Sequence, residues 1–275
     1  MLPLTRYLVL LLPLSVCAAT DDLLFNLGLR QGGAVAGYSA NAADFDGASY
    51  IRSTSGNLDA DSKQGIFSTF ARFDGSDGVQ KALVHYSQSG GTNVRFIIER
   101  TAGNVLRIVG RNASGTDILD ISTVATITAD ATWHHVACSW DLADTAKRHC
   151  YIDGSSSLSV TTYTDDTIDY AHSAGSHRKT IGGNSGTTPG ALMNGCLSEL
   201  FFDNIYFDLS AAGNLEKFRS ASGKPVNLGS DGSIPTGSQP TLYFRTAVPD
   251  WETNSGTSSG PWSESGTLTI CSSLP

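Results

Sequence analysis

The amino-acid sequence predicts an all-β protein: an antiparallel β-sandwich, or jelly roll, with an irregular C-terminal extension. Short runs of alternating or continuously apolar residues recur along the chain, each bounded by Gly, Asn, Asp or Ser. This is the pattern of many short strands. Amphipathic helices are not interleaved between the runs, so the pattern favours packed antiparallel sheets.

The expected strands follow these runs in order, and one modest helix is expected at 211–219. Most runs are four to nine residues long and rich in Val, Ile, Phe, Tyr, Thr or Trp, which suit a pleated, half-buried surface. No repeat of solenoid or propeller size is visible. The expected strands are 43–45, 49–53, 65–73, 81–87, 94–100, 105–110, 123–127, 133–140, 148–152, 179–181, 195–206 and 242–244.

The run 133–140 shows how side chains alternate between the two faces of a strand. His134, Val136 and Trp140 share one face, whereas Trp133 and His135 lie on the other. The adjacent histidines therefore cannot converge on one metal ion, and we interpret them as structural. A turn follows at Asp153-Gly154, where Gly supplies a positive φ and Asp bonds to its own backbone.

Composition and charge limit the classes of function. The chain has 275 residues, of which 40% are hydrophobic and 16% charged, enough to build one domain with appendages. Its 18 basic and 26 acidic residues give a net charge of −8, and no basic cluster occurs. Nucleic-acid partners are therefore not expected, because phosphate neutralisation needs clustered Lys and Arg. We divide the chain into segment 1–19, a sandwich at 20–220 and an extension at 221–275.

Segment 1–19 is hydrophobic. Residues 7–20 carry no charge, follow Arg6 and end in small residues. This is typical of a secretory signal peptide, and the segment is too short for a comfortable membrane span. One alternative is a lipoprotein box at Cys17, which Val16 disfavours. The other is a buried strand in an assembly, so both a secreted and an assembly-bound protein remain open.

The five cysteines contain no CxxC pair, which makes a zinc site improbable. If the hairpin 133–152 is symmetric about Asp144, Cys138 and Cys150 face each other with Cα atoms roughly 4.5–5.5 Å apart, within disulfide range. Two free thiols packed as small hydrophobic groups fit the same positions equally well. Cys196 and Cys271 are the second candidate pair. Without Cys17 the count is even, which suits an oxidising compartment.

Several strings in order resemble a known family. They are DFDGASYI at 44–51, FSTFARF at 67–73, WHHVA at 133–137, YIDG at 151–154, IGG at 181–183 and GCLSEL at 195–200. Together they resemble the laminin-G-like, concanavalin A-like lectin/glucanase jelly roll over residues 42–219. The resemblance implies the fold; it does not select a function, since this sandwich carries many.

The extension adds a second resemblance. Its strings SGKPVNLGSDGSIPTG at 222–237, QPTLYF at 239–244 and WETNSGT at 251–257 resemble the tails of laminin-G-like proteins encoded by bacteriophages and prophages. That implies a non-catalytic structural or attachment protein of a virion or another extracellular assembly. Its partners would be other structural proteins, copies of itself, or a glycan or cell-surface polysaccharide. The aromatic residues of the extension are expected to dock on the sandwich or on a neighbouring subunit.

A secreted bacterial carbohydrate-binding module is the alternative, and Tyr163, Tyr170 and Trp262 are the aromatic residues that would contact sugar rings. A glycoside hydrolase is disfavoured because the Glu-x-Asp-x-x-Glu string of the glucanases that the sequence resembles is absent. The nearest acidic pair, Glu199 and Asp203, is about 13 Å apart along a strand, too far for a paired mechanism.

The resemblance also allows one cofactor, Ca²⁺. Sandwiches of this kind hold the ion through loop carboxylates, amides and backbone carbonyls, as a hard cation requires. Acidic loop clusters are the candidates, although such residues are also common in turns. The candidate ligands are Asp74, Asp77, Asp165, Asp166, Asp169, Asp203 and Asn204.

Overall fold

The computed structural model describes residues 38–88, 93–171, 177–258 and 260–275. The predicted signal peptide or assembly strand at 1–19, with Cys17, lies outside these residues. The chain divides into units 1–37 and 38–275, and the second is described below. In the described residues no helix has the length and apolar character needed to cross a membrane.

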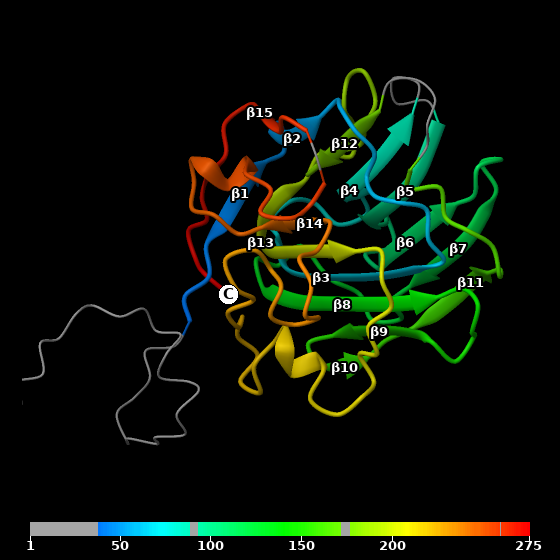
Figure 1. Cartoon of the computed structure of the whole chain (residues 1–275). Coiled ribbons are helices and arrows are strands. Elements are labelled where there is room, and N and C mark those ends of the chain that lie inside the picture. The colour runs from blue at the N-terminus through cyan, green and yellow to red at the C-terminus, as the bar shows by residue number, and fades with distance from the viewer. Residues whose placement is uncertain (1–37, 89–92, 172–176, 259) are drawn as a thin grey trace, which may run out of the picture. The chain divides into compact units, whose positions relative to one another are not determined.

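Two antiparallel sheets face each other, which confirms the predicted sandwich (Figure 1). One sheet, here called sheet A, has the order β10-β9-β8-β3-β13-β1-β16, with β14 also paired to β13. Sheet B has the order β11-β7-β6-β5-β4-β12-β2-β15. The strands are β1 (Ala42–Asp46), β2 (Tyr50–Ser53), β3 (Gln64–Phe73), β4 (Lys81–Gln88), β5 (Asn93–Arg100), β6 (Leu106–Arg111), β7 (Asp117–Ser122), β8 (Trp133–Asp141), β9 (Arg148–Ile152), β10 (Ser155–Ser156), β11 (Ser159–Tyr163), β12 (Arg178–Ile181), β13 (Asn194–Asp203), β14 (Leu242–Phe244), β15 (Ser263–Ser265) and β16 (Thr269–Ile270).

Some sequence predictions of elements were wrong. The strand expected at 123–127 is irregular, because the Thr123 hydroxyl turns back to bond the carbonyl of Ala125, and the strand lies earlier, at β7. The run expected at 195–206 ends at Asp203, whose carboxylate accepts the N–H of Asn204. The helix expected at 211–219 is a single 3-10 turn, Leu215–Lys217. The strands missed by sequence are short and rich in Ser and Thr.

The main core lies between the two sheets and is built from the inward side chains of nearly every strand. Phe96 of β5 is in ring contact with Trp140, Tyr170 and Phe202, with centroids 5.0–6.0 Å apart. Gly65 faces Trp140 so closely that no side chain fits between them. This packing holds the ends of the strands, and the loops that leave them, in fixed positions.

A second core covers the outer face of sheet A. The chain after β13 crosses this face, and its apolar residues pack on Ile66 and Ala137. The extension therefore docks on its own sandwich: β14, β15 and β16 pair with β13, β2 and β1. The residues that bury this face from the later chain are Leu209, Phe218, Leu228 and Tyr243.

Both candidate cysteine pairs form disulfides in the structure. Cys138 and Cys150 are directly opposed in the β8–β9 ladder, with Cα atoms 4.1 Å apart. Cys196 of β13 is bonded to Cys271, which follows β16, and so ties the end of the extension to sheet A. The first bond reinforces a local hairpin, whereas the second closes a long loop.

Candidate functional site

The three aromatic residues predicted to contact sugar do not form one surface. Tyr170 is fully buried in the main core, so its ring cannot meet a ligand. Tyr163 is half-buried, and its hydroxyl accepts the N–H of Asp141 and donates to the carbonyl of Lys147. Trp262 packs edge-on against Phe244, on a different part of the molecule. All three rings serve packing.

Three of the predicted calcium ligands are paired with cationic side chains instead. Asp74 accepts two hydrogen bonds from the guanidinium of Arg72, and Asp77 is paired with the buried Arg100. Asp165 lies 2.7 Å from the ammonium of Lys63 in an exposed ion pair. Their negative charge is balanced within the protein. Asp74 and Asp77 share the β3–β4 connection, whereas Asp165 follows β11, so the three do not form a common cation site.

Asp203 and Asn204 lie at the end of β13. The Asp203 carboxylate is buried beside Asp59, and the hydroxyl of Thr241 lies between the two carboxyls. Burial raises the pKa of Asp203 to about 6. A group that favours its neutral form is a poor ligand for Ca²⁺. Among described residues, one further cluster has metal-ligand geometry, Asp44 with Asp74 and Cys196; Cys196 is locked in a disulfide, and Asp74 is paired with Arg72.

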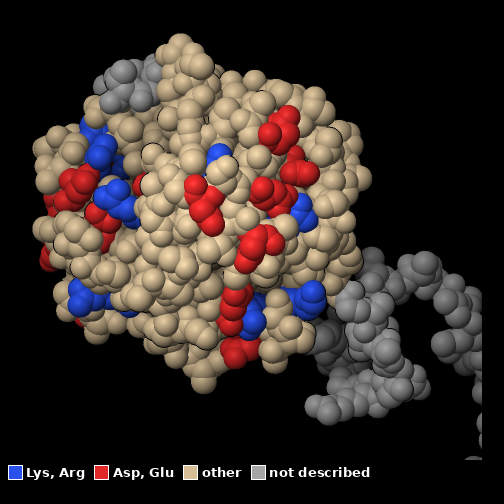
Figure 2. Space-filling view, turned by 180° about the vertical axis from the view of Figure 1, so that it is seen from behind, with Lys and Arg blue, Asp and Glu red and all other residues tan. Residues whose placement is uncertain are grey.

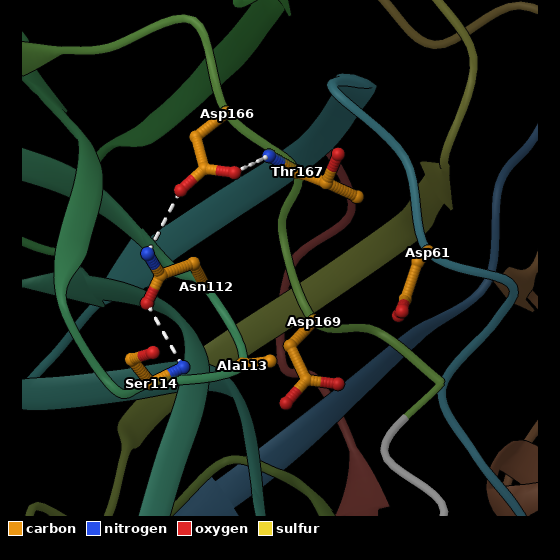
Figure 3. A pocket seen from close by; sticks show the side chains of 7 residues that line it. All are labelled: Asp61, Asn112, Ala113, Ser114, Asp166, Thr167 and Asp169. Atoms are coloured by element: carbon orange, nitrogen blue, oxygen red, sulfur yellow. Dashed lines mark hydrogen bonds between the residues drawn. The ribbon is translucent and has the colours of Figure 1, made fainter.

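Asp166 and Asp169, in contrast, line a polar cleft of about 270 Å³, which we call the loop cleft (Figure 3). Three loops form it: the β2–β3 connection, the β6–β7 turn and the segment after β11. Asp61 lies on the side opposite Asn112 (Figure 3). Its lining residues are Asp61, Asn112, Ala113, Ser114, Asp166, Thr167 and Asp169.

The β6–β7 turn forms one wall of the loop cleft because its sequence closes on itself. The side-chain oxygen of Asn112 accepts the N–H groups of Ser114 and Thr116. Gly115 adopts a φ of 83°, a left-handed conformation that Gly tolerates. The remaining amide group of Asn112 donates to the carboxylate of Asp166, 2.8 Å away. The turn and the segment after β11 are therefore joined by side chains.

Asp166 and Asp169 have different electrostatic surroundings. The hydrogen bond from Asn112, with a second from the Thr167 N–H, lowers the pKa of Asp166, which keeps this carboxyl ionised. Asp169 is buried and lies 3.2 Å from the equally buried guanidinium of Arg95. Arg95 also donates to the carbonyl of Asn112. It thus balances the charge of Asp169 and holds the wall in place.

Asp61 completes the loop cleft from the β2–β3 connection. One carboxylate oxygen accepts the N–H of Ala171, 2.7 Å away, and the side chain is otherwise exposed. Ser62 and Ile168 exchange two backbone hydrogen bonds beside it. Asp61 and Asp166 therefore both present carboxylate oxygens to the loop cleft, and such oxygens accept hydrogen bonds from hydroxyl groups or ligate a hard cation.

The sequence predicts Asp166 and Asp169 as candidate ligands, whereas Asp61 and Asn112 are not among the residues that it singles out. A local signal existed for Asp61, because Asp59-Ala60-Asp61 is an acidic stretch between two strands. Its proximity to Asp166, about a hundred residues later, has no such signal. It depends on how the loops meet at one end of the sandwich.

The other titratable groups that the sequence singles out are bonded to side chains of the protein. Glu199 and Asp203 have different partners: Glu199 accepts hydrogen bonds from the hydroxyls of Tyr38 and Tyr243 in a buried cluster. His135 is buried under the later chain, with its Nε2 3.0 Å from the Ser68 hydroxyl. His134 points to the other face and contacts Asp153. The histidines thus lie apart, as the alternation of strand residues predicts.

Charges of both signs are interspersed on the surface. Figure 2 shows acidic and basic side chains next to one another on the face seen from behind. On sheet B, for example, Arg107 is bonded to Asp120 and lies 3.7 Å from Glu99. Such a face offers no continuous positive surface to a phosphate backbone.

Comparison with known families matches residues 45–206 to the laminin G profile of the concanavalin A-like lectin/glucanases superfamily. The match covers more than half of the chain, which therefore belongs to this family, as the sequence strings predicted. No curated protein matches the chain.

Solved structures share the fold at low identity. A Bacteroides ovatus protein, described as a candidate carbohydrate-binding protein, has 15% identity and a TM-score of 0.55 over 86% of this chain. This chain spans 62% of that protein. A heptameric SAP-like pentraxin from Limulus polyphemus has 12% identity and a TM-score of 0.52, with 85% of this chain and 96% of the pentraxin covered. At these identities the similarity concerns the fold alone.

Proposed function

We propose that the protein is a glycan-binding module and that the loop cleft is its binding site. The observation that carries this proposal is the lining of the cleft, which combines carboxylates, a carboxamide and hydroxyls on a lectin-type sandwich. Sugars present many hydroxyl groups, and each carboxylate oxygen accepts hydrogen bonds from them. The buried Arg95–Asp169 pair fixes the walls beforehand, which reduces the entropy lost on binding.

A glycan array followed by calorimetry tests the proposal. Asp61→Ala removes an exposed carboxylate whose hydrogen bond within the protein is to the N–H of Ala171, so folding should be preserved. We expect it to weaken binding of an array hit about tenfold, which corresponds to about 1.4 kcal/mol. Asp144→Ala is the matched control, because Asp144 is an exposed turn aspartate in the β8–β9 connection. A negative array, or equal binding by both variants, would overturn the proposal.

We propose the loop cleft as the Ca²⁺ site as well. Asp61 and Asp166 provide the oxygen ligands that Ca²⁺ prefers, whereas Asp74, Asp77 and Asp165 do not fit. The calorimetric titrations are therefore repeated with added Ca²⁺ and with a chelator. Loss of glycan binding in the chelator, restored by Ca²⁺, would support an ion in the site. Unchanged binding would reject it. Release of reducing ends from the bound glycan would favour the hydrolase alternative.

We propose attachment to a glycan-bearing surface as the role of this binding, in a phage virion or another extracellular assembly. Two disulfides support an oxidising environment, since such bonds are rare in the cytosol. Mass spectrometry of the mature N-terminus distinguishes a secreted module from a virion protein. Retention of Met1 would contradict the secreted module, and a start near Ala19 would weaken the virion role.

A further inference from the structure

A second cleft of about 330 Å³ lies where the β2–β3 connection meets the C-terminal extension. We call it the strap cleft. Like the loop cleft, it is lined mainly by groups that form hydrogen bonds. Its lining residues are Gly56, Asn57, Leu58, Asp59, Thr257 and Ser258.

The two clefts share one stretch of chain. Asp59 lines the strap cleft and Asp61 lines the loop cleft, so their Cα atoms are at most about 7 Å apart. This stretch is clamped to the segment after β11, because the carbonyl of Tyr170 accepts the N–H groups of both Leu58 and Asp59. The clefts are therefore adjacent, and the wall between them is rigid.

The side of the strap cleft that the C-terminal extension forms is also held in place. The ammonium group of Lys179 is buried beneath it and donates to the carbonyl of Asn57 and to the hydroxyl of Ser258. Asn254 donates to the carbonyl of Ser258, and the N–H of Thr257 bonds the carbonyl of Pro240. Asn57 and Thr257 remain exposed above this support. The Thr257 hydroxyl donates to the carbonyl of Pro240, and its oxygen can still accept a hydrogen bond from a ligand.

We propose that the loop cleft and the strap cleft are neighbouring subsites of one extended site, and that its ligand is a linear, uncharged oligosaccharide. The inference rests on the proposed glycan binding and deepens it. A chain that fills the loop cleft alone would leave the polar groups of the strap cleft to water, whereas a longer chain would bond to both. When no Ca²⁺ is bound, the carboxylates of Asp59, Asp61 and Asp166 give the site negative charge, which disfavours acidic sugars.

Calorimetry with oligosaccharide ladders tests this inference. The probes are the cello-, xylo-, manno- and N-acetylchito-oligosaccharides from disaccharide to hexasaccharide, with oligogalacturonides as the acidic series. For the ladder that binds, we expect affinity to rise about tenfold or more from the shortest to the longest member, as one added set of contacts worth about 1.4 kcal/mol would produce. In the presence of a chelator, the acidic ladder should bind more weakly at every length.

The double variant Asn57→Ala/Thr257→Ala should remove the length dependence, so that the ratio of longest-chain to shortest-chain affinity falls from tenfold to about one. Asp61→Ala should weaken every member, and Asp144→Ala should change none. Length-independent binding that is still sensitive to Asp61→Ala would overturn the extended site while leaving the proposed function in place. Absence of binding by every ladder and by the array would overturn both.

Discussion

Asp59 and Asp203 meet at a single hydroxyl, that of Thr241, which lies within hydrogen-bond reach of both carboxyls. Thr241 belongs to the extension, Asp59 to the β2–β3 connection and Asp203 to β13. One hydroxyl proton can bond to one carboxylate at a time, so the arrangement favours a proton on the other carboxyl. This junction joins the extension to the sandwich beside the strap cleft.

The junction predicts a stability that falls as pH rises. Burial, with the charge of Asp59 as a smaller cause, raises the pKa of Asp203 from 3.8 to about 6. The folded state therefore holds a proton that the unfolded state has lost over this window, and this contribution to stability is lost as pH rises through about 6. Asp203→Asn should stabilise the protein at neutral pH and by much less near pH 4. Urea unfolding of wild type and Asp203→Asn between pH 4 and neutral pH measures the difference in their free energy of unfolding. Asp144→Asn is the control. A difference that does not change with pH would contradict the prediction.

The burial of His135 predicts the opposite pH dependence of folding stability, a loss at low pH. Complete burial lowers its pKa to about 3, with Arg219 contributing and Asp153 opposing. The unfolded state binds the proton first, so stability is lost as pH falls from 6.5 towards 3. His135→Gln, which retains a group able to bond Ser68, should flatten this acid limb. Acid titration of both proteins, monitored by near-ultraviolet circular dichroism, tests this prediction. If the substitution leaves the acid unfolding transition unchanged, groups other than His135 control that transition.

The two disulfides should contribute unequally to stability. Cys196–Cys271 spans 75 residues, whereas Cys138–Cys150 spans 12. In the chain-entropy account, the longer loop restricts the unfolded state more, about 4 kcal/mol against about 3 kcal/mol. Replacing both cysteines of each pair with Ala and comparing guanidinium unfolding measures the difference. A larger loss from the Cys138/Cys150 variant would mean that native packing, rather than loop closure, dominates.

The contact between Gly65 and Trp140 predicts strong sensitivity to a small change. A methyl group at position 65 would overlap the indole ring, which is completely buried between the sheets. Gly65→Ala should destabilise the protein by about 1–3 kcal/mol. At Gly103 the nearest atom would lie at 3.5 Å, so Gly103→Ala should stay within about 0.5 kcal/mol. Thermal unfolding compares them, and equal midpoints would contradict the packing argument.

Part of the candidate site could be predicted from sequence and part could not. Asp166 and Asp169 stood out because acidic residues gather in a turn. Tyr170, four residues after Asp166, was predicted to be a contact for sugar rings, yet its ring is buried against Phe96 and Phe202. Residue type alone does not distinguish a core tyrosine from an exposed one, since both suit a strand-rich protein.

The sequence by itself determined the sandwich, most of its strands and the opposition of Cys138 and Cys150, because alternation and hairpin symmetry are local properties. Only the tertiary structure decided that Asp61 and Asp166 line one cleft, that Asp59 lies beside Asp203, and that the extension covers sheet A. These contacts join residues far apart in the chain. The packing of the two sheets brings particular loops to the same end of the sandwich. Local sequence patterns do not encode which loops these are.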